Sequence, residues 1–346
     1  MVWDLGRHAF PQLTATGREY LAYAAALATT LLFFASVLLH ELSHSFVARR
    51  MGIGVSRITL FIFGGVAQVD EEPKTPRQEL LISIAGPAMS VLLAAVFGAA
   101  AMLLRNRWGT TIPGLCLERV AQVNLVLAIF NMVPGFPLDG GRILRSLLWM
   151  GWSDRVRSTR VASVFGQLVG YALAGLGVLQ GVALGSPWLG IFYVGMGLLL
   201  ASVARGTYKR ELVQAALDAT PVWHFAVPPE ASFPLGTPLS YAAPYLLARG
   251  GGMLVPVLLD SQPVGVLSRD IVAAIPPWQW TQLRVEDVMD TLREDMVLRT
   301  SQSATAALDL MHREKRSSLM LVDQWGNFGG IVTAASLHAA LASMQG

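Results

Sequence analysis

The chain has 346 residues, of which 53% are hydrophobic and 14% are charged, and its formal net charge is +3. Ordinary soluble domains carry about 25% charged residues, so this composition indicates a membrane-embedded protein, and the small net charge argues against nucleic acid as a partner. The single cysteine, Cys116, excludes both an internal disulfide and a zinc cluster built from thiolates.

The deficit of charged residues is confined to the N-terminal part of the chain. Residues 1 to about 205 have a membrane-like composition, whereas residues from about 210 to 346 have that of a soluble α/β segment. Met1–Glu19 is polar and lacks the pattern of a cleavable signal peptide. The next stretch, Tyr20–Leu39, is uncharged and long enough for one transmembrane helix.

The first span ends in His40-Glu41-Leu42-Ser43-His44, an HExxH motif. Residues four apart share one face of a helix, so His40 and His44 can present two imidazoles to one metal ion. Glu41 lies beside them and is placed to activate a water molecule. The alternative is that these are ordinary polar residues at the end of a span, but ionisable residues near a bilayer are costly and usually functional. The motif therefore predicts hydrolysis within or at the edge of the membrane.

A short segment after the first span, Ile58–Val69, is rich in β-branched and aromatic residues and is split by Gly64-Gly65. It is too short to cross the membrane as a helix, and its composition predicts a β-hairpin or a re-entrant loop. At membrane depth, such backbone must be covered by protein or line a wet cavity. The alternative is a plain cytoplasmic hairpin.

The remaining spans are predicted from long apolar runs. They are Leu80–Leu104, the shorter Val120–Val133, and Val161–Ala204, which is too long for one helix and is divided near Gly185-Ser186-Pro187. The total is five spans. With the C-terminus in the cytoplasm, thirteen Lys and Arg residues lie inside and five outside, which favours this orientation and places the HExxH motif toward the cytoplasmic end of its span.

The segment after the third span supplies a candidate for a third metal ligand, which a catalytic zinc site requires. Asp139 is the only carboxylate between Glu118 and Asp154, and it follows Pro134-Gly135-Phe136-Pro137. The prolines end regular helix ahead of it, and the glycine pair after it allows close backbone approach. An oxygen ligand beside two imidazoles gives a set that suits zinc.

Two asparagines in the third span, Asn124 and Asn131, are seven residues apart and share one helix face. An amide there can hydrogen-bond a peptide carbonyl or a developing oxyanion, or it can simply tie helices together. We favour the helix tie for Asn124. For Asn131, which adjoins the segment with the prolines and Asp139, we favour a functional role.

The chain resembles the site-2 proteases, intramembrane zinc metalloproteases, in the branch that carries C-terminal CBS domains. The resemblance rests on HELSH in a span, the FGG loop at Gly64-Gly65, Gly86-Pro87-Ala88-Met89-Ser90 in the second span and NMVPGFPLDGGR at Asn131–Arg142. It covers residues from about 10 to the C-terminus. Members of this branch usually have six spans, and the span that would precede Tyr20 is not found in this sequence.

The resemblance implies a role for each candidate residue. It implies His40, His44 and Asp139 as the zinc ligands, with one zinc per chain, and Glu41 as the general base. It also implies that Asn131 and Pro137 lie near the substrate, and that the loop at Gly64 and Gly65 helps to hold an unwound substrate strand.

Two similar units follow the last span, at about 213–276 and 284–346. Each is predicted to form a strand, a helix, two strands joined by a short turn, and a helix. Both resemble CBS motifs, a pair of which forms one compact module. We therefore predict a transmembrane metalloprotease domain at 1–210, with its catalytic core at 20–142, and tandem CBS domains at 211–346.

CBS pairs often bind adenine nucleotides through a T-x-x-D pattern, and neither unit matches it. The first has Ser268-Arg269-Asp270, one residue short, and the second has Thr333-Ala334-Ala335-Ser336, without the Asp. A structural role, or a homodimer formed through this module, is at least as well supported as nucleotide sensing.

The predicted fold is a polytopic α-helical membrane domain of about five transmembrane helices with one short β-hairpin or re-entrant loop, followed by a soluble α/β tandem CBS module. The predicted function is hydrolysis of a peptide bond in or near a transmembrane segment of a membrane-protein substrate (regulated intramembrane proteolysis). The predicted location is the cell membrane, with the CBS module cytoplasmic. The rivals are a CBS-regulated channel or transporter, which gives no reason for the HExxH motif, and an inactive relative that only binds membrane proteins.

Overall fold

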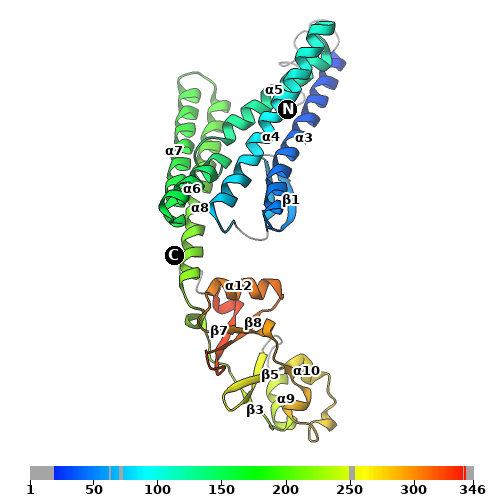
Figure 1. The fold of residues 1–346 in the computed structure, drawn as a ribbon, viewed down its shortest axis with the longest axis vertical. Coiled ribbons are helices and arrows are strands. Elements are labelled where there is room, and N and C mark those ends of the chain that lie inside the picture. Colours follow the sequence, from blue (N-terminus) through cyan, green and yellow to red (C-terminus); the bar gives the residue numbers. More distant parts are fainter. Residues whose placement is uncertain (1–18, 62–63, 70–72, 249–253, 338, 340–346) are drawn as a thin grey trace. The chain divides into compact units, whose positions relative to one another are not determined.

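The computed structural model describes residues 19–61, 64–69, 73–248, 254–337 and 339, and the backbone alone is described for 55–61 and 64–69. The chain forms two compact units, Met1–Tyr208 and Lys209–Gly346 (Figure 1). The first unit is helical apart from one hairpin, and the second contains strands and short helices.

The described residues contain five helices long and apolar enough to cross a membrane, which confirms the predicted number. They are α3 (Glu19–Arg50), α4 (Pro76–Trp108), α5 (Ile112–Asn131), α7 (Arg155–Val182) and α8 (Pro187–Ala219). The long apolar run is divided where predicted, because α7 ends before Gly185 and α8 begins at Pro187. The helices extend beyond the apolar runs, so α3 carries the whole HExxH motif without a break.

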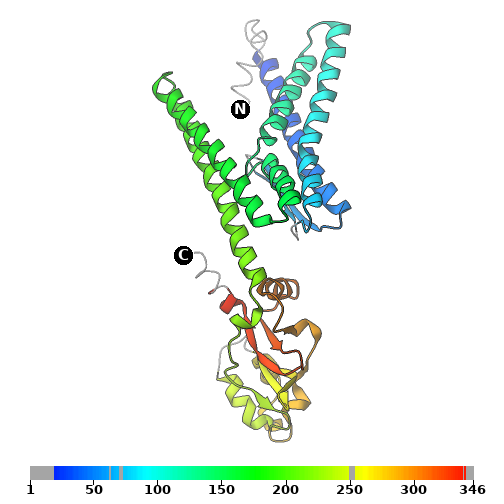
Figure 2. The same ribbon diagram turned by 60° about the vertical axis from the view of Figure 1, so that its left-hand side comes forward.

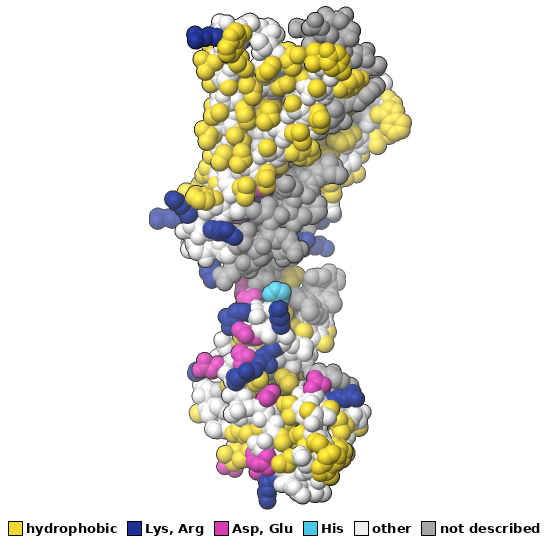
Figure 3. Space-filling model, turned by 90° about the vertical axis from the view of Figure 1, so that its right-hand side faces the viewer, with side chains coloured by type: hydrophobic (Ala, Val, Ile, Leu, Met, Phe, Trp, Pro, Cys, Tyr) yellow, Lys and Arg dark blue, Asp and Glu magenta, His cyan; other side chains and the backbone are white. Residues whose placement is uncertain are grey.

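The membrane helices bury small residues and expose large apolar ones. In α3, Ala22 and Ala26 are buried, whereas Leu31 and Phe34 are exposed. Figure 3 shows hydrophobic side chains spread over the visible surface of the helical unit. This arrangement is typical of helices that pack closely against each other and face lipid on the outside. The protein is therefore a multi-pass membrane protein.

The segment between α3 and α4 forms the predicted hairpin. Strand β1 (Val55–Phe61) pairs antiparallel with β2 (Gly64–Val69), and the hairpin lies against α3 (Figure 1). Gly64 pairs with Phe61 and Gly65 with Leu60, so the glycine pair lies at the turn end of the hairpin. Residues 62–63 of the predicted loop lie outside the described residues.

Helix α6 (Asp139–Trp152) was not among the predicted elements. It is shorter than the spans and amphipathic, and it packs against α4 and α7. Its first residue is Asp139, so the candidate ligand opens a helix rather than lying in an extended loop.

Helices α7 and α8 lie side by side, as both ribbon views show (Figure 2). They approach closely because Gly170 faces Gly197 and Gly177 faces Gly190, and a Cβ on any of these would collide with the backbone of the other helix. Small residues at such crossings are the usual basis of helix packing in membranes.

The C-terminal unit repeats one topology, as predicted. The first copy contains β3 (Phe233–Pro234), α9 (Leu239–Leu247), β4 (Leu254–Leu259), β5 (Gln262–Ser268) and α10 (Arg269–Ala273). The second contains β7 (Val297–Arg299), α12 (Ala304–Arg313), β8 (Ser318–Val322), β9 (Phe328–Thr333) and helical residues 334–337. In each copy the first two strands pair parallel and the last two antiparallel, around an apolar core of its own.

Candidate metal centre

The structure brings His40, His44 and Asp139 together at the junction of α3 and α6. The Nε2 atoms of His40 and His44 are 3.3 Å apart, and they lie 3.2 Å and 3.4 Å from Oδ2 of Asp139. His40 is 4% exposed. Among the described residues, these three form the one group of His, Cys, Asp and Glu side chains whose ligand atoms converge in this way.

The spacing of these three atoms fits a tetrahedral metal ion. Zinc binds imidazole nitrogen and carboxylate oxygen at about 2.0–2.1 Å, and a tetrahedron with such bonds has edges of about 3.3–3.4 Å. The observed separations of 3.2, 3.3 and 3.4 Å form one triangular face of such a tetrahedron. Three protein ligands leave the fourth position open, as a catalytic zinc site requires.

The other nitrogen of each imidazole is held by α4. Nδ1 of His44 lies 2.7 Å from the backbone carbonyl oxygen of Ile82, which can only accept, so Nδ1 carries the proton. Nδ1 of His40 lies 2.9 Å from Oγ of Ser90. With the proton on Nδ1, as in His44, the lone pair of Nε2 points toward the cluster. Partners of this kind typically fix the orientation of a metal-binding histidine.

Gly86 lies between these two contact points on α4 and provides the space in front of the imidazoles. A Cβ at this position would collide with Nε2 of both His40 and His44. The two imidazoles can therefore take these positions only because residue 86 has no side chain. The donor set and its spacing both fit a bound zinc ion.

The position of Asp139 depends on close contacts between two glycines in the first turn of α6 and the backbone of the preceding loop. A Cβ on Gly140 would collide with the backbone of Met132 and Val133, and one on Gly141 with the backbone of Gly135. The loop is also fixed to α7, since the backbone N–H of Phe136 donates to the carbonyl of Ala162 at 3.3 Å. The loop thus folds tightly over the first turn of α6.

A buried ion pair joins the first turn of α4 to α6. Arg145 donates from Nε to Oε1 of Glu79 at 2.8 Å and also contacts this oxygen through Nη2. Glu79 is 2% exposed and Arg145 is 8% exposed. The Arg145 guanidinium lies 5.1 Å from the ring centroid of Phe136, in the loop that precedes Asp139. The pair therefore braces the element that presents the third ligand.

Removing one partner of this ion pair is expected to destabilise the membrane domain. Arg145→Met leaves a buried carboxylate unpaired, which typically costs about 3–5 kcal/mol, whereas replacing both partners by apolar residues is often close to neutral. We expect a lower melting temperature in detergent for Arg145→Met than for the double variant Glu79→Met, Arg145→Met. A single variant as stable as wild type would contradict this role.

The other predicted site residues lie on four different elements. Glu41 is half-buried on α3, next to His40. Asn131 is the last residue of α5, half-buried, and Pro137 is exposed in the loop before α6. Gly64 and Gly65 lie at the turn end of the hairpin, where they pair with Phe61 and Leu60.

Asn124 has the role of a helix tie, as expected. Its Nδ2 donates to Oγ of Ser36 on α3 at 3.1 Å and to the carbonyl of Val120 at 2.9 Å. Sequence reasoning did not assign roles to Gly86, Ser90, Glu79 or Arg145. Gly86 and Ser90 lie in the segment on which the family resemblance rests, and this could have indicated a role for them. Glu79 is a carboxylate at the start of a span, where an ionisable residue usually has a function.

Comparison with known proteins identifies relatives of the whole chain. A family model described as peptidase family M50 matches residues 28–107 and 112–176. The protein named "Putative zinc metalloprotease sll0528" from Synechocystis is 32% identical over 344 residues, which is 98% of this chain and 87% of that protein.

Two solved structures resemble separate parts of the chain. The site-2 protease from Methanocaldococcus jannaschii is 33% identical, with a TM-score of 0.41, and the match covers 53% of this chain and 78% of that one. A CBS domain-containing protein from Bacillus anthracis is 21% identical, with a TM-score of 0.33, over 38% of this chain and 98% of that one.

Proposed function

The chain belongs to peptidase family M50, the zinc metalloproteases of the site-2 type, and we propose that it hydrolyses a peptide bond in or near a transmembrane segment of a membrane protein. The observation that supports this most strongly is the convergence of His40, His44 and Asp139 inside a helical membrane domain. In this proposal these three residues hold one zinc ion, with His40 and His44 binding through Nε2.

Zinc bound by these residues would supply a Lewis acid that polarises the scissile carbonyl and lowers the pKa of water, so that the water can lose a proton and attack that carbonyl. Glu41 accepts the proton of the attacking water and passes it to the nitrogen of the leaving amine. The Asn131 amide hydrogen-bonds the carbonyl oxygen as negative charge develops on it. The substrate helix has its backbone paired internally, so it must unwind before attack, and Pro137 and the hairpin end at Gly64 and Gly65 hold the unwound strand.

The C-terminal module is proposed to act in regulation or dimerisation rather than as a strong nucleotide site. In the second unit, the hydroxyl oxygens of the altered motif already accept hydrogen bonds from backbone N–H groups of the same turn. The backbone N–H of Thr333 donates to Oγ of Ser336 at 3.2 Å, and that of Ser336 donates to Oγ1 of Thr333 at 3.0 Å. The module is proposed to be cytoplasmic, on the side that carries most of the basic residues.

Metal removal tests the proposed function. A panel of tagged single-span membrane proteins is first co-expressed with the wild-type chain to find a substrate that is cleaved. This substrate and the wild-type chain are then purified and reconstituted together in phospholipid vesicles. We expect one zinc per chain by elemental analysis, loss of cleavage after the zinc is removed by a chelator, and recovery when Zn²⁺ is returned. Cleavage that persists in the metal-free protein would overturn the proposal.

A further inference from the structure

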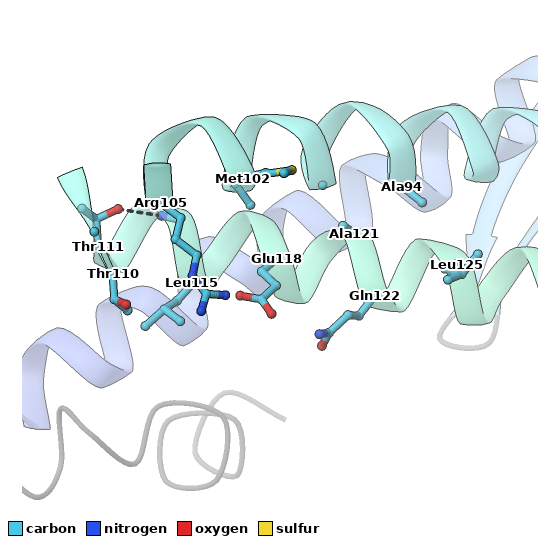
Figure 4. Close-up of a pocket in the computed structure, with 14 residues that line it drawn as sticks. Ala94, Met102, Arg105, Thr110, Thr111, Leu115, Glu118, Ala121, Gln122 and Leu125 are labelled. Carbon is cyan, nitrogen blue, oxygen red and sulfur yellow. Dashed lines mark hydrogen bonds between the residues drawn. The ribbon is translucent and has the colours of Figure 1, made fainter. Parts of the chain in front are cut away.

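A groove with a volume of about 520 Å³ lies between the C-terminal half of α4 and the N-terminal half of α5. None of the residues that line it belongs to the metal cluster. The groove is apolar over most of its length and carries charged side chains near the turn that joins the two helices (Figure 4).

The apolar part is hollow because its lining side chains are small. Gly98 and Ala101 on α4 face Gly114 and Ala121 on α5, and the exposed side chain of Met102 also lines the groove. A Cβ at Gly98 would meet nothing closer than the Cβ of Ala121, at 3.8 Å. Because Met102 and Leu125 in its lining are exposed, the hollow is open at the surface of these membrane helices, where lipid chains can reach it.

The polar part carries one charge of each sign. Arg105 from α4 and Glu118 from α5 extend into the groove from opposite walls, with Gln122 beside the carboxylate (Figure 4). Both charged side chains are exposed, and the described part of the chain contains no ion pair between them. Charges near the hydrocarbon region are costly unless they are paired, and the two ends of a zwitterion that enters the groove would supply a partner of opposite sign for each.

The depth of these charges matches a lipid head group. At a rise of about 1.5 Å per residue, Arg105 lies about 4.5 Å before the end of α4 and Glu118 about 9 Å after the start of α5. Trp108, at the end of α4, is 68% exposed. Tryptophan is enriched where transmembrane helices meet the membrane–water interface, so the two charges lie at the boundary between head groups and hydrocarbon.

We propose that this groove binds one phospholipid with a phosphoethanolamine head group. An acyl chain lies along the small residues of the floor. The phosphate accepts hydrogen bonds from the Arg105 guanidinium, whose planar fork suits it, and the lipid ammonium donates to the Glu118 carboxylate. An anionic glycerol head group satisfies Arg105 only and has nothing to donate as a cation to Glu118, so it binds more weakly.

The test is a titration of the full-length, delipidated protein in detergent with phosphatidylethanolamine and with phosphatidylglycerol, followed by native mass spectrometry. We expect wild type to bind phosphatidylethanolamine about tenfold more tightly than phosphatidylglycerol, because one additional charge-assisted hydrogen bond typically strengthens binding by about this factor. Glu118→Gln is expected to abolish this preference, and Arg105→Gln to weaken both lipids.

Two further variants separate the groove from the general lipid surface. Gly98→Leu places a larger side chain on the floor, where an added Cβ has only the Cβ of Ala121 within 4 Å, so it is expected to remove tight binding of both lipids. Arg107→Gln, at the same end of α4 but outside the groove, is the matched control and is expected to bind like wild type. Equal binding of the two lipids by wild type, or unchanged binding in Gly98→Leu or Glu118→Gln, would overturn the proposal.

Discussion

Replacement of Glu41 by glutamine is expected to slow peptide hydrolysis by a factor of about 10²–10⁴ while one zinc ion stays bound, because general acid–base catalysis typically contributes that much. Glutamine keeps the size of the side chain but cannot accept the proton of the attacking water. The ligands His40, His44 and Asp139 are untouched by this change, and their mutual contacts do not involve residue 41. The measurement is the single-turnover rate of substrate cleavage in vesicles, with zinc content determined on the same sample.

Two comparison variants make this result interpretable. Glu294→Gln makes the same chemical change at an exposed position in the C-terminal unit and is expected to cleave like wild type. Asp139→Asn weakens the ligand set itself, so it is expected to lose zinc as well as activity. A Glu41→Gln protein that cleaves at the wild-type rate would remove Glu41 from the mechanism.

Gly86→Ala is expected to reduce zinc affinity by about 100-fold or more, since changes to residues around a metal site already cost 10- to 100-fold without blocking the site. The new methyl group would occupy the space between the two imidazole nitrogens. Either the metal is excluded or His40 and His44 must rotate away from Asp139, and both outcomes abolish hydrolysis. Zinc content after dialysis against a buffered free-zinc series measures the effect.

The matched control lies on the same helix. Gly98→Ala makes the identical substitution in α4, where the added Cβ has only the Cβ of Ala121 near it, at 3.8 Å. We expect it to keep wild-type zinc affinity, with a small gain in helix stability of about 0.5–1 kcal/mol. If Gly86→Ala also keeps wild-type affinity, the space in front of the imidazoles is not the space that the metal uses.

The spans and the ligand residues could be predicted because their signals are local in sequence. A run of apolar residues marks a span at any position, and HExxH places two imidazoles by helix geometry alone. Asp139 could be named because it is the one carboxylate in its stretch of the sequence. Its position at the first turn of α6 could not be predicted, since the loop before it is shaped by contacts among Gly140, Gly141 and the backbone preceding them.

The contacts that hold the site together join residues far apart in the sequence, so no periodic pattern of residues marks them. Ser90 is 50 positions from His40, and Glu79 is 66 positions from Arg145. Such pairs form only when α3, α4 and α6 pack against each other, so no local sequence pattern predicts them. The charge count used for orientation included Arg145 among the cytoplasmic basic residues, but its guanidinium is buried against a carboxylate. Leaving it out does not change the direction of the bias.

His40 and Asp139 are 99 positions apart in the sequence, and this separation affects the order in which the metal site is assembled. The first two ligands leave the ribosome on α3, but the third follows only after the hairpin, α4 and α5 have been synthesised. A zinc ion that joins them closes a loop through all of these elements, so it is captured by a domain that is already inserted in the membrane. If these residues hold zinc as proposed, metal loading is a late step of maturation, because the complete ligand set exists only in the inserted domain.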